Sequence, residues 1–297
     1  MTLKLLATGC KGQVVTALRR LCEAEGVALV CVGRPDVDLA NLTDFESVLR
    51  AHEPDAVVNA AAWTAVDLAE TNVAEAYALN CVAAGRISAA AAQAGLPVIQ
   101  ISTDYVFAGD RPDAYREDDV PGPASIYGAS KLAGERAVAA ANPQHVILRT
   151  SWVYSATGQN FLKTMLRVGR ERDVVRVVAD QTGAPTHADI VADGVLRVAR
   201  AICEPCAAAD LFGVFHLTAA GEASWRDFAC AIFEESASLG GPLPEVEAIA
   251  TADYPTPARR PANSRLDCSK IARTHGVRPQ HWREAVAATV ARVLRGD

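Results

Sequence analysis

The chain has 297 residues, half of them hydrophobic and 22% charged, with a formal net charge of −6 at pH 7. This composition is typical of an ordinary globular protein, and the modest negative charge argues against a nucleic-acid polymer as partner. No apolar run approaches the roughly 18 residues that a membrane span requires, so no membrane partner is expected. Because Lys4, Lys11 and Arg19 interrupt the N-terminal stretch, it lacks a signal-peptide pattern, and we expect a cytoplasmic protein.

The eight cysteines are scattered through strand-like and helix-like text. This distribution favours small buried side chains over a disulfide framework. Cys203 and Cys206 form a C-x-x-C pair, but no partner pair or strand-to-helix context accompanies them. A redox or zinc site is therefore the weaker interpretation of this pair.

The first 150 residues alternate between short apolar runs and longer alanine-rich stretches. Buried parallel strands are predicted at 3–8, 27–32, 55–62, 97–102 and 145–150. Helices are predicted at 15–26, 41–54 and 75–95, the second with Thr43 as N-cap and Glu46 as its capping-box partner. The alternation predicts an α/β fold with a doubly wound, parallel, Rossmann-type sheet. Its ligand crevice would lie at the carboxyl ends of the strands.

After Arg149 the alternation loosens, which predicts a smaller C-terminal substrate-binding lobe. Its segments are strand-like 174–178, helical 189–202, strand-like 213–218, helical 224–235, a Pro/Arg-rich loop at 254–267 and a helix beginning near Trp282. We expect a dinucleotide-binding domain over 1–150 and a lobe that binds mainly substrate over 151–297. Segments near 186–217 are candidates to return to the sheet.

A glycine turn, TGCKGQVVTAL at residues 8–18, follows the first predicted strand. Gly9 and Gly12 would let backbone N–H groups approach a pyrophosphate at the start of a helix. Val15 stands where a third glycine is expected, and it would push the helix outward unless a small neighbour such as Ala7 gives space. We expect nucleotide binding to survive. A tight turn without a ligand is the alternative.

Tyr127 and Lys131, in YGASK, lie four residues apart and would share one face of a helix. An ammonium group beside a phenol favours the phenolate and lowers the pKa of the phenol, which suits an acid that protonates a developing alkoxide. The pair follows ISTDYVF, a predicted strand ending in Ser102, Thr103 and Asp104, at the edge where the crevice opens. A surface pair on a helix is the alternative.

Several motifs along the chain together resemble one family. They are TGxxGQ, NAAAWTAVDLAE, STDYVFAG, YGASKLAGE, RTSWVYSATGQNF, DQTGAPT and PTPARRPANSRLD. In combination they are similar to the dTDP-4-dehydrorhamnose reductases, a family of extended short-chain dehydrogenases. The resemblance runs from residue 3 to about residue 270, and the later motifs are the more specific ones.

The resemblance implies NAD(P)H-dependent reduction of the 4-keto group of dTDP-4-dehydro-6-deoxy-L-mannose to dTDP-L-rhamnose. The implied catalytic residues are Thr103, Tyr127 and Lys131. Implied or expected cofactor contacts are Gly9, Gly12, Gln13, Val14, Arg34, Asp38, Leu39, Ala62, Trp63, Thr64, Tyr127 and Lys131. Expected substrate contacts are Thr103, Asp104, Tyr105, Trp152 and Arg260. Asp104 would accept hydrogen bonds but be a poor acid at neutral pH.

Cofactor choice is suggested by the end of the second predicted strand, CVGRP. No carboxylate precedes Gly33 to hold a ribose hydroxyl, whereas Arg34 could meet a 2′-phosphate. NADPH is therefore the expected cofactor, with NADH possible. An ordinary surface arginine is the alternative.

The chain departs from the family pattern at a metal position. In some members glutamates hold magnesium at a dimer contact, but the first of these aligns with Ala17, so no metal is expected. Monomer and homodimer both remain open. Two other functions are weighed: a non-catalytic regulatory or binding subunit, and another sugar-nucleotide epimerase, reductase or dehydratase. The intact trio of Thr103, Tyr127 and Lys131 disfavours the first, and Tyr105 stands where dehydratases carry a glutamate.

Overall fold

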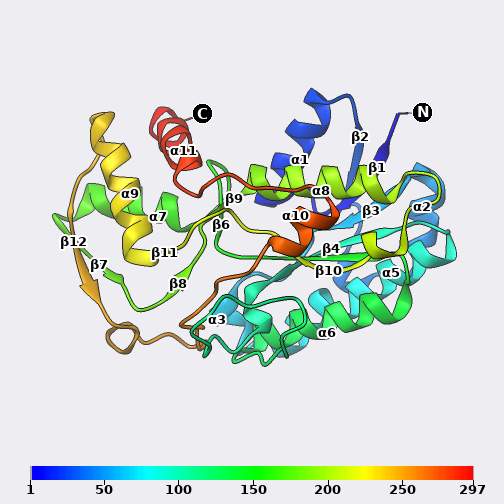
Figure 1. Ribbon diagram of the computed structural model, residues 1–297, viewed down its shortest axis with the longest axis horizontal. Coiled ribbons are helices and arrows are strands. Elements are labelled where there is room, and N and C mark those ends of the chain that lie inside the picture. The colour runs from blue at the N-terminus through cyan, green and yellow to red at the C-terminus, as the bar shows by residue number, and fades with distance from the viewer. Residues whose placement is uncertain (1, 297) are drawn as a thin grey trace.

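A six-stranded parallel sheet forms the centre of the computed structural model, which describes residues 2–296 (Figure 1). Its strands are β1 (Lys4–Thr8), β2 (Ala28–Val32), β3 (Ala56–Asn59), β4 (Val98–Thr103), β5 (His145–Thr150) and β10 (Gly213–His216). They follow the order β10-β5-β4-β3-β1-β2, and every pair is parallel. The predicted doubly wound α/β sheet is confirmed.

Helices cover both faces of this sheet because side chains alternate across a strand. Leu5 and Ala7 of β1 share one apolar core with α1 (Gln13–Ala24) and α8 (Ala188–Ile202). Leu6, which lies between them, joins a core on the other face with α5 (Ala84–Gln93) and α6 (Ile126–Ala141). Figure 1 shows these two helix pairs on opposite sides of the sheet.

Two of the predicted helices differ from expectation. Within the segment 41–54 the structure has only a short helix, α2 (Glu46–His52), and a 3-10 turn, η1 (Leu39–Asn41), precedes it. The capping box on Thr43 is wrong, because Asp44 instead accepts the backbone N–H of Ser47 at 2.9 Å. The segment 75–95 is three consecutive pieces: the end of α4 (Val73–Tyr77), a π-helix η2 (Ala78–Ala83), and α5.

A second apolar core lies beside the sheet, at the left of Figure 1. It is built by α7 (Phe161–Glu171), the parallel pair β7 (Val174–Val178) and β12 (Glu245–Ile249), α9 (Trp225–Ser238) and α11 (Glu284–Arg295). We call these elements the smaller lobe. Short pairs connect its margin to the sheet layer: β6 (Val153–Tyr154) with β9 (Thr186–His187), and β8 (Thr182–Gly183) with β11 (Ala223–Ser224). The remaining short elements are α3 (Val66–Ala69), η3 (Asp104–Val106), η4 (Ala209–Leu211), η5 (Thr251–Asp253) and α10 (Ser269–Thr274).

The sheet order places a ligand crevice at one point. After β2 the chain crosses back to β3 on the other side of β1, so connections leave the carboxyl ends of β1 and β3 in opposite directions. Such a switch point is where doubly wound sheets bind nucleotides. No helix within residues 2–296 is both long and apolar enough to cross a bilayer.

Candidate active site

A cavity of about 740 Å³ opens at this switch point, and its lining extends to Trp225 of the smaller lobe. It brings together most of the predicted site residues: Gly9, Gly12, Gln13, Val14, Arg34, Leu39, Ala62, Thr64, Thr103, Asp104, Tyr105, Tyr127, Lys131 and Trp152. Three predicted residues, Asp38, Trp63 and Arg260, do not line this cavity.

The glycine turn forms an open cradle at one end of the cavity. Gly9 has a φ of +90°, which residues with a side chain rarely adopt. Gly12 is the N-cap of α1, no side chain caps this helix start, and a β-carbon at Gly12 would meet nothing within 4 Å. The unpaired N–H groups and the positive end of the helix dipole suit a phosphate. The residues present therefore fit the pyrophosphate of a dinucleotide.

Val15 and Gln13 show how the turn is held. Val15 is 1% exposed and lies in the same apolar core as Ala7 and α8, so the core has packed around this valine. The Gln13 amide oxygen accepts hydrogen bonds from Ser155 Oγ at 3.0 Å and from Asn160 Nδ2 at 2.8 Å. The side chain of Gln13 thus ties α1 to the loop after β6, which leaves its backbone N–H as the group for a phosphate.

Arg34 lies at the rim of the cavity with its side chain 74% exposed, and its Nε is 3.8 Å from Asp38 Oδ1. The Asp38 carboxylate accepts the Asn41 side-chain amide and the Ala40 N–H, and these bonds lower its pKa. Asp38 therefore caps η1, whereas Leu39 of that turn lines the cavity.

Tyr127 and Lys131 project from the first two turns of α6, whose N-cap Ser125 accepts the Gly128 N–H at 3.2 Å. Burial raises the pKa of Tyr127, while a hydrogen bond with Thr103 acts in the opposite direction. The expectation that Lys131 lowers the pKa of this phenol is wrong for the protein alone. The cost of removing a phenolate from water dominates, and the negative charge of Asp104 also acts against the phenolate.

Lys131 is almost fully buried, and its Nζ donates to the Ile101 carbonyl at 2.7 Å. Burial lowers its pKa to about 8, and the charge of Glu135 opposes that shift. Glu135 itself accepts Ser102 Oγ at 2.5 Å and Arg149 Nε at 2.9 Å. At neutral pH Lys131 is mostly charged, beside a buried ion pair that joins α6 to β5.

Asp104 is the second buried acid of the site. Its Oδ1 accepts a hydrogen bond from Thr103 Oγ1 at 2.9 Å, and hydrogen bonds from Thr103 and Ser264 favour the ionised form. Burial raises the pKa of Asp104 to about 6. A carboxyl group with this pKa is still mostly ionised at pH 7, although desolvation brings its protonated form closer to neutral pH than in water.

Asn80 is a site residue that the sequence did not reveal. Its Oδ1 accepts the Trp63 N–H at 2.8 Å, and its Nδ2 donates to Ser130 Oγ at 2.9 Å. Asn80 thus fixes the loop after β3 to the catalytic helix. The available signal was a polar residue within an alanine-rich helix, and a π-helix at this point is typical of functional sites.

A second cavity, of about 540 Å³, lies along the Pro/Arg-rich loop and is lined by Asp180, Thr251, Tyr254, Arg259 and Arg260 among others. Arg260 donates to both carboxylate oxygens of Asp67 in α3, at 3.1 and 2.9 Å. The predicted substrate arginine therefore lies here, paired with a residue of the sheet layer. Trp225, which lines the first cavity, was predicted only as part of a helix.

No group of three or more His, Cys, Asp or Glu side chains within residues 2–296 is arranged to hold a metal ion. Ala17, at the aligned metal position, is 6% exposed and packs in the core with Val15. All eight cysteines of the described chain are free thiols.

The fold and the tyrosine–lysine pair define a dinucleotide-dependent oxidoreductase of the short-chain dehydrogenase class. The model of the RmlD substrate binding domain family matches residues 3–295. The dTDP-4-dehydrorhamnose reductase of Sinorhizobium fredii is 48% identical over 98% of this chain and 98% of its own. That of Burkholderia thailandensis is 42% identical over 98% of this chain and 99% of its own. The chain belongs to the dTDP-4-dehydrorhamnose reductase family, and the predicted resemblance is confirmed.

Solved structures agree with this assignment. A dTDP-4-dehydrorhamnose reductase from Clostridium acetobutylicum superposes with a TM-score of 0.91 at 34% identity, covering 98% of this chain and 100% of that one. The Bacillus anthracis enzyme, in complex with NADP, superposes with a TM-score of 0.89 at 32% identity. The match covers 98% of this chain and 99% of that one. MoeE5 in complex with UDP-glucose and NAD, with a TM-score of 0.80 at 22% identity, shares the fold.

Proposed function

We propose that this chain reduces the 4-keto group of dTDP-4-dehydro-6-deoxy-L-mannose to give dTDP-L-rhamnose, with NADPH as the preferred hydride donor. The observation that carries the proposal is that Thr103, Tyr127 and Lys131 line the same cavity as the glycine turn. The names of the similar reductases, and the NADP bound to the Bacillus anthracis enzyme, support the same chemistry.

The cofactor would be held by the open cradle at Gly9 and Gly12, with Arg34 at the rim for a 2′-phosphate. When bound, reduced nicotinamide supplies a hydride to the carbonyl carbon. The composition supports a cytoplasmic protein.

The proton is supplied by the chain itself. Tyr127 keeps its proton at neutral pH because burial raises its pKa. That proton is then available as negative charge develops on the substrate oxygen. The hydrogen bond with Thr103 favours the phenolate that remains.

The test is oxidation of NADPH by purified protein, followed by absorbance, with enzymatically prepared dTDP-4-keto-6-deoxy-L-mannose. We expect substrate-dependent oxidation and dTDP-L-rhamnose as product. The same sugar on UDP serves as a control for recognition of the base. Binding of NADPH without any reduction of the sugar would overturn the proposal and favour a regulatory subunit.

A further inference from the structure

Trp152, at the cavity wall, has an unusual backbone conformation. Its φ is 49°, in the left-handed region that bulky residues rarely occupy. Such a conformation persists only where the surrounding structure enforces it, and it is found most often at functional sites. The contacts that hold Trp152 therefore bear on what its indole does.

Trp225 makes the first of these contacts. The two indole rings are nearly parallel, with centroids 3.5 Å apart and an interplanar angle of 7°. Trp225 is the first residue of α9, directly after the N-cap Ser224, and its Nε1 donates to Gln181 Oε1 at 3.1 Å. A helix start and a hydrogen bond thus fix the ring on which Trp152 stacks.

Gly183 makes the second contact. A β-carbon built on Gly183 would lie 2.6 Å from Cε2 of Trp152, too close for any residue except glycine. Gly183 pairs with Ala223 across β8 and β11, which sets its position relative to Trp225. Thr186, three residues later, donates its N–H to the Trp152 carbonyl at 3.2 Å. We call Gly183 and Trp225 the indole clamp.

A hydrogen-bond chain leads from the clamp to the second cavity. Gln181 Nε2 donates to Thr251 Oγ1 at 3.1 Å, and Thr251 Oγ1 donates to Asp180 Oδ1 at 2.6 Å. Thr251 and Asp180 line the second cavity together with Arg260, whose guanidinium suits a diphosphate. The clamp therefore connects the catalytic cavity with the cavity that holds the arginines.

We propose that Gly183 and Trp225 are positioning residues that hold the Trp152 indole in place for the sugar nucleotide before it binds. This inference rests on the proposed function for the identity of the ligand. A flat ring that is already ordered loses little conformational freedom when a sugar packs against it, so more of the contact energy appears as affinity. Trp225 acts through Trp152 and has no part in proton transfer.

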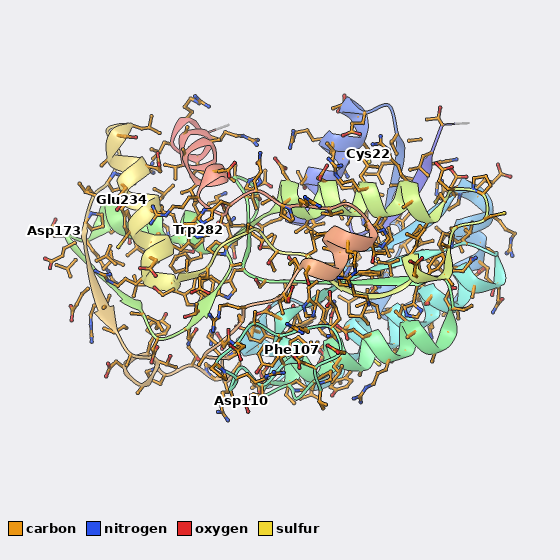
Figure 2. All side chains as sticks on the ribbon, viewed as in Figure 1. Cys22, Phe107, Asp110, Asp173, Glu234 and Trp282 are labelled. Carbon is orange, nitrogen blue, oxygen red and sulfur yellow. The ribbon has the colours of Figure 1, made fainter. Side chains whose placement is uncertain are left out.

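The kinetic test uses Trp225→Leu, which removes the stacked ring, and Gly183→Ala, which forces the indole to move. We expect each to raise KM for the sugar nucleotide about tenfold, or about 1.4 kcal/mol. KM for NADPH should stay unchanged, because the glycine turn is untouched. Trp282→Phe is the matched control: Trp282 is buried in the same lobe (Figure 2), and its loss should leave both constants unchanged.

A second readout needs no activity. The protein has four tryptophans, whose indole N–H signals can be resolved by NMR after 15N labelling. Removing the Trp225 ring current, or displacing the indole with Gly183→Ala, should move the Trp152 signal, whereas Trp282→Phe should not. An unmoved Trp152 signal would overturn the clamp. So would a moved signal with an unchanged KM for the sugar nucleotide.

The two proposals can fail separately. The protein could reduce no sugar and still show a Trp152 signal that shifts on adding dTDP, with this response lost in Trp225→Leu. That result would support the clamp and overturn the proposed function. A loss of folding stability in Trp225→Leu with both KM values unchanged would show a packing role only, and would overturn the inference.

Discussion

At the scale of single residues, burial sets the proton chemistry of the site. Burial raises the pKa of Tyr127 and brings that of Asp104 to about 6, while it lowers that of Lys131 to about 8. Each shift has the same cause, the cost of a charge away from water. The site therefore holds a protonated phenol beside a lysine that is still mostly charged at neutral pH.

Tyr127→Phe should lower kcat by about 10²–10⁴-fold, the usual contribution of general acid catalysis. Phenylalanine keeps the ring and removes the proton, so the Kd for NADPH should change little. Tyr154→Phe is the control, since Tyr154 is a buried tyrosine of the second apolar core whose hydroxyl donates to the Trp282 carbonyl. Near-normal turnover of Tyr127→Phe would remove this residue from the mechanism.

Arg34→Ala tests cofactor choice. If the guanidinium meets the 2′-phosphate, the variant should lose about 1–2 kcal/mol of NADPH binding, and NADH binding should be unchanged. Kd values for both cofactors, measured by fluorescence titration, check this. Arg50→Ala removes another exposed arginine, far along the chain on α2, as a control. Equal losses for both cofactors would identify Arg34 as an ordinary surface residue.

At the scale of elements, α1 and α6 carry the site, and each is anchored by a buried side chain that touches no ligand. Val15 anchors α1 in the apolar core shared with α8. Glu135 anchors α6 through its ion pair with Arg149 of β5, in which both side chains are 4% exposed. Variants of these anchors separate stability from binding.

Val15→Gly should lower the free energy of unfolding and leave cofactor affinity nearly unchanged. Glycine within a helix costs about 0.5–1 kcal/mol, and the lost valine adds a further cost through lost burial and a cavity. A thermal melt and an NADPH titration on one sample measure both effects. A tenfold gain in affinity without loss of stability would mean that the native turn is impaired by Val15.

Glu135→Leu should destabilise the protein by about 3–5 kcal/mol, because it leaves the Arg149 charge buried without its partner. The double variant with Arg149→Met should recover much of that loss, since neither charge then remains. Urea unfolding measures both free energies. If the single variant has the same free energy of unfolding as the double variant, the unpaired Arg149 charge carries no cost, and the buried ion pair does not stabilise the fold.

Periodicity predicted the elements of the sheet layer well, because buried parallel strands and amphipathic helices leave strong patterns. It failed where a local contact decides the outcome. The Asp44 carboxylate, and not the Thr43 hydroxyl, accepts a backbone N–H at the start of α2. An alanine-rich run carries no pattern that distinguishes the π-helix η2 from an α-helix.

At the scale of the whole molecule, the sequence predicted which residues line the cavity better than how they are held. Motifs predicted Trp152, which lines the first cavity, and Arg260, which lines the second. Only the fold brings Trp225 onto Trp152, and Asp67 onto Arg260, from positions far apart in the chain. Long-range contacts of this kind have no periodic signature. The pKa directions also required the fold, because they depend on burial.

The stability of the whole molecule against acid should be governed by two buried groups with opposite effects. Burial and the charge of Arg149 lower the pKa of His216 from 6.5 to about 3. Between these two pKa values the unfolded chain binds a proton at His216 and the folded chain does not. The free energy of unfolding therefore falls as pH falls below 6.5. The pKa of Asp104 rises from 3.8 to about 6. Between these values only the folded chain holds the proton, so stability rises as pH falls below about 6.

Single variants should separate these two effects, which largely cancel in the native protein. Between about pH 7 and about pH 5, His216 lowers the free energy of unfolding by about 2 kcal/mol and Asp104 raises it by about 1 kcal/mol. His216→Phe should therefore become more stable on acidification than the native protein does, and Asp104→Asn should become less stable. Urea unfolding of both variants and the native protein at the two pH values measures the slopes. Identical slopes in all three proteins would show that neither group is buried as the structure has it.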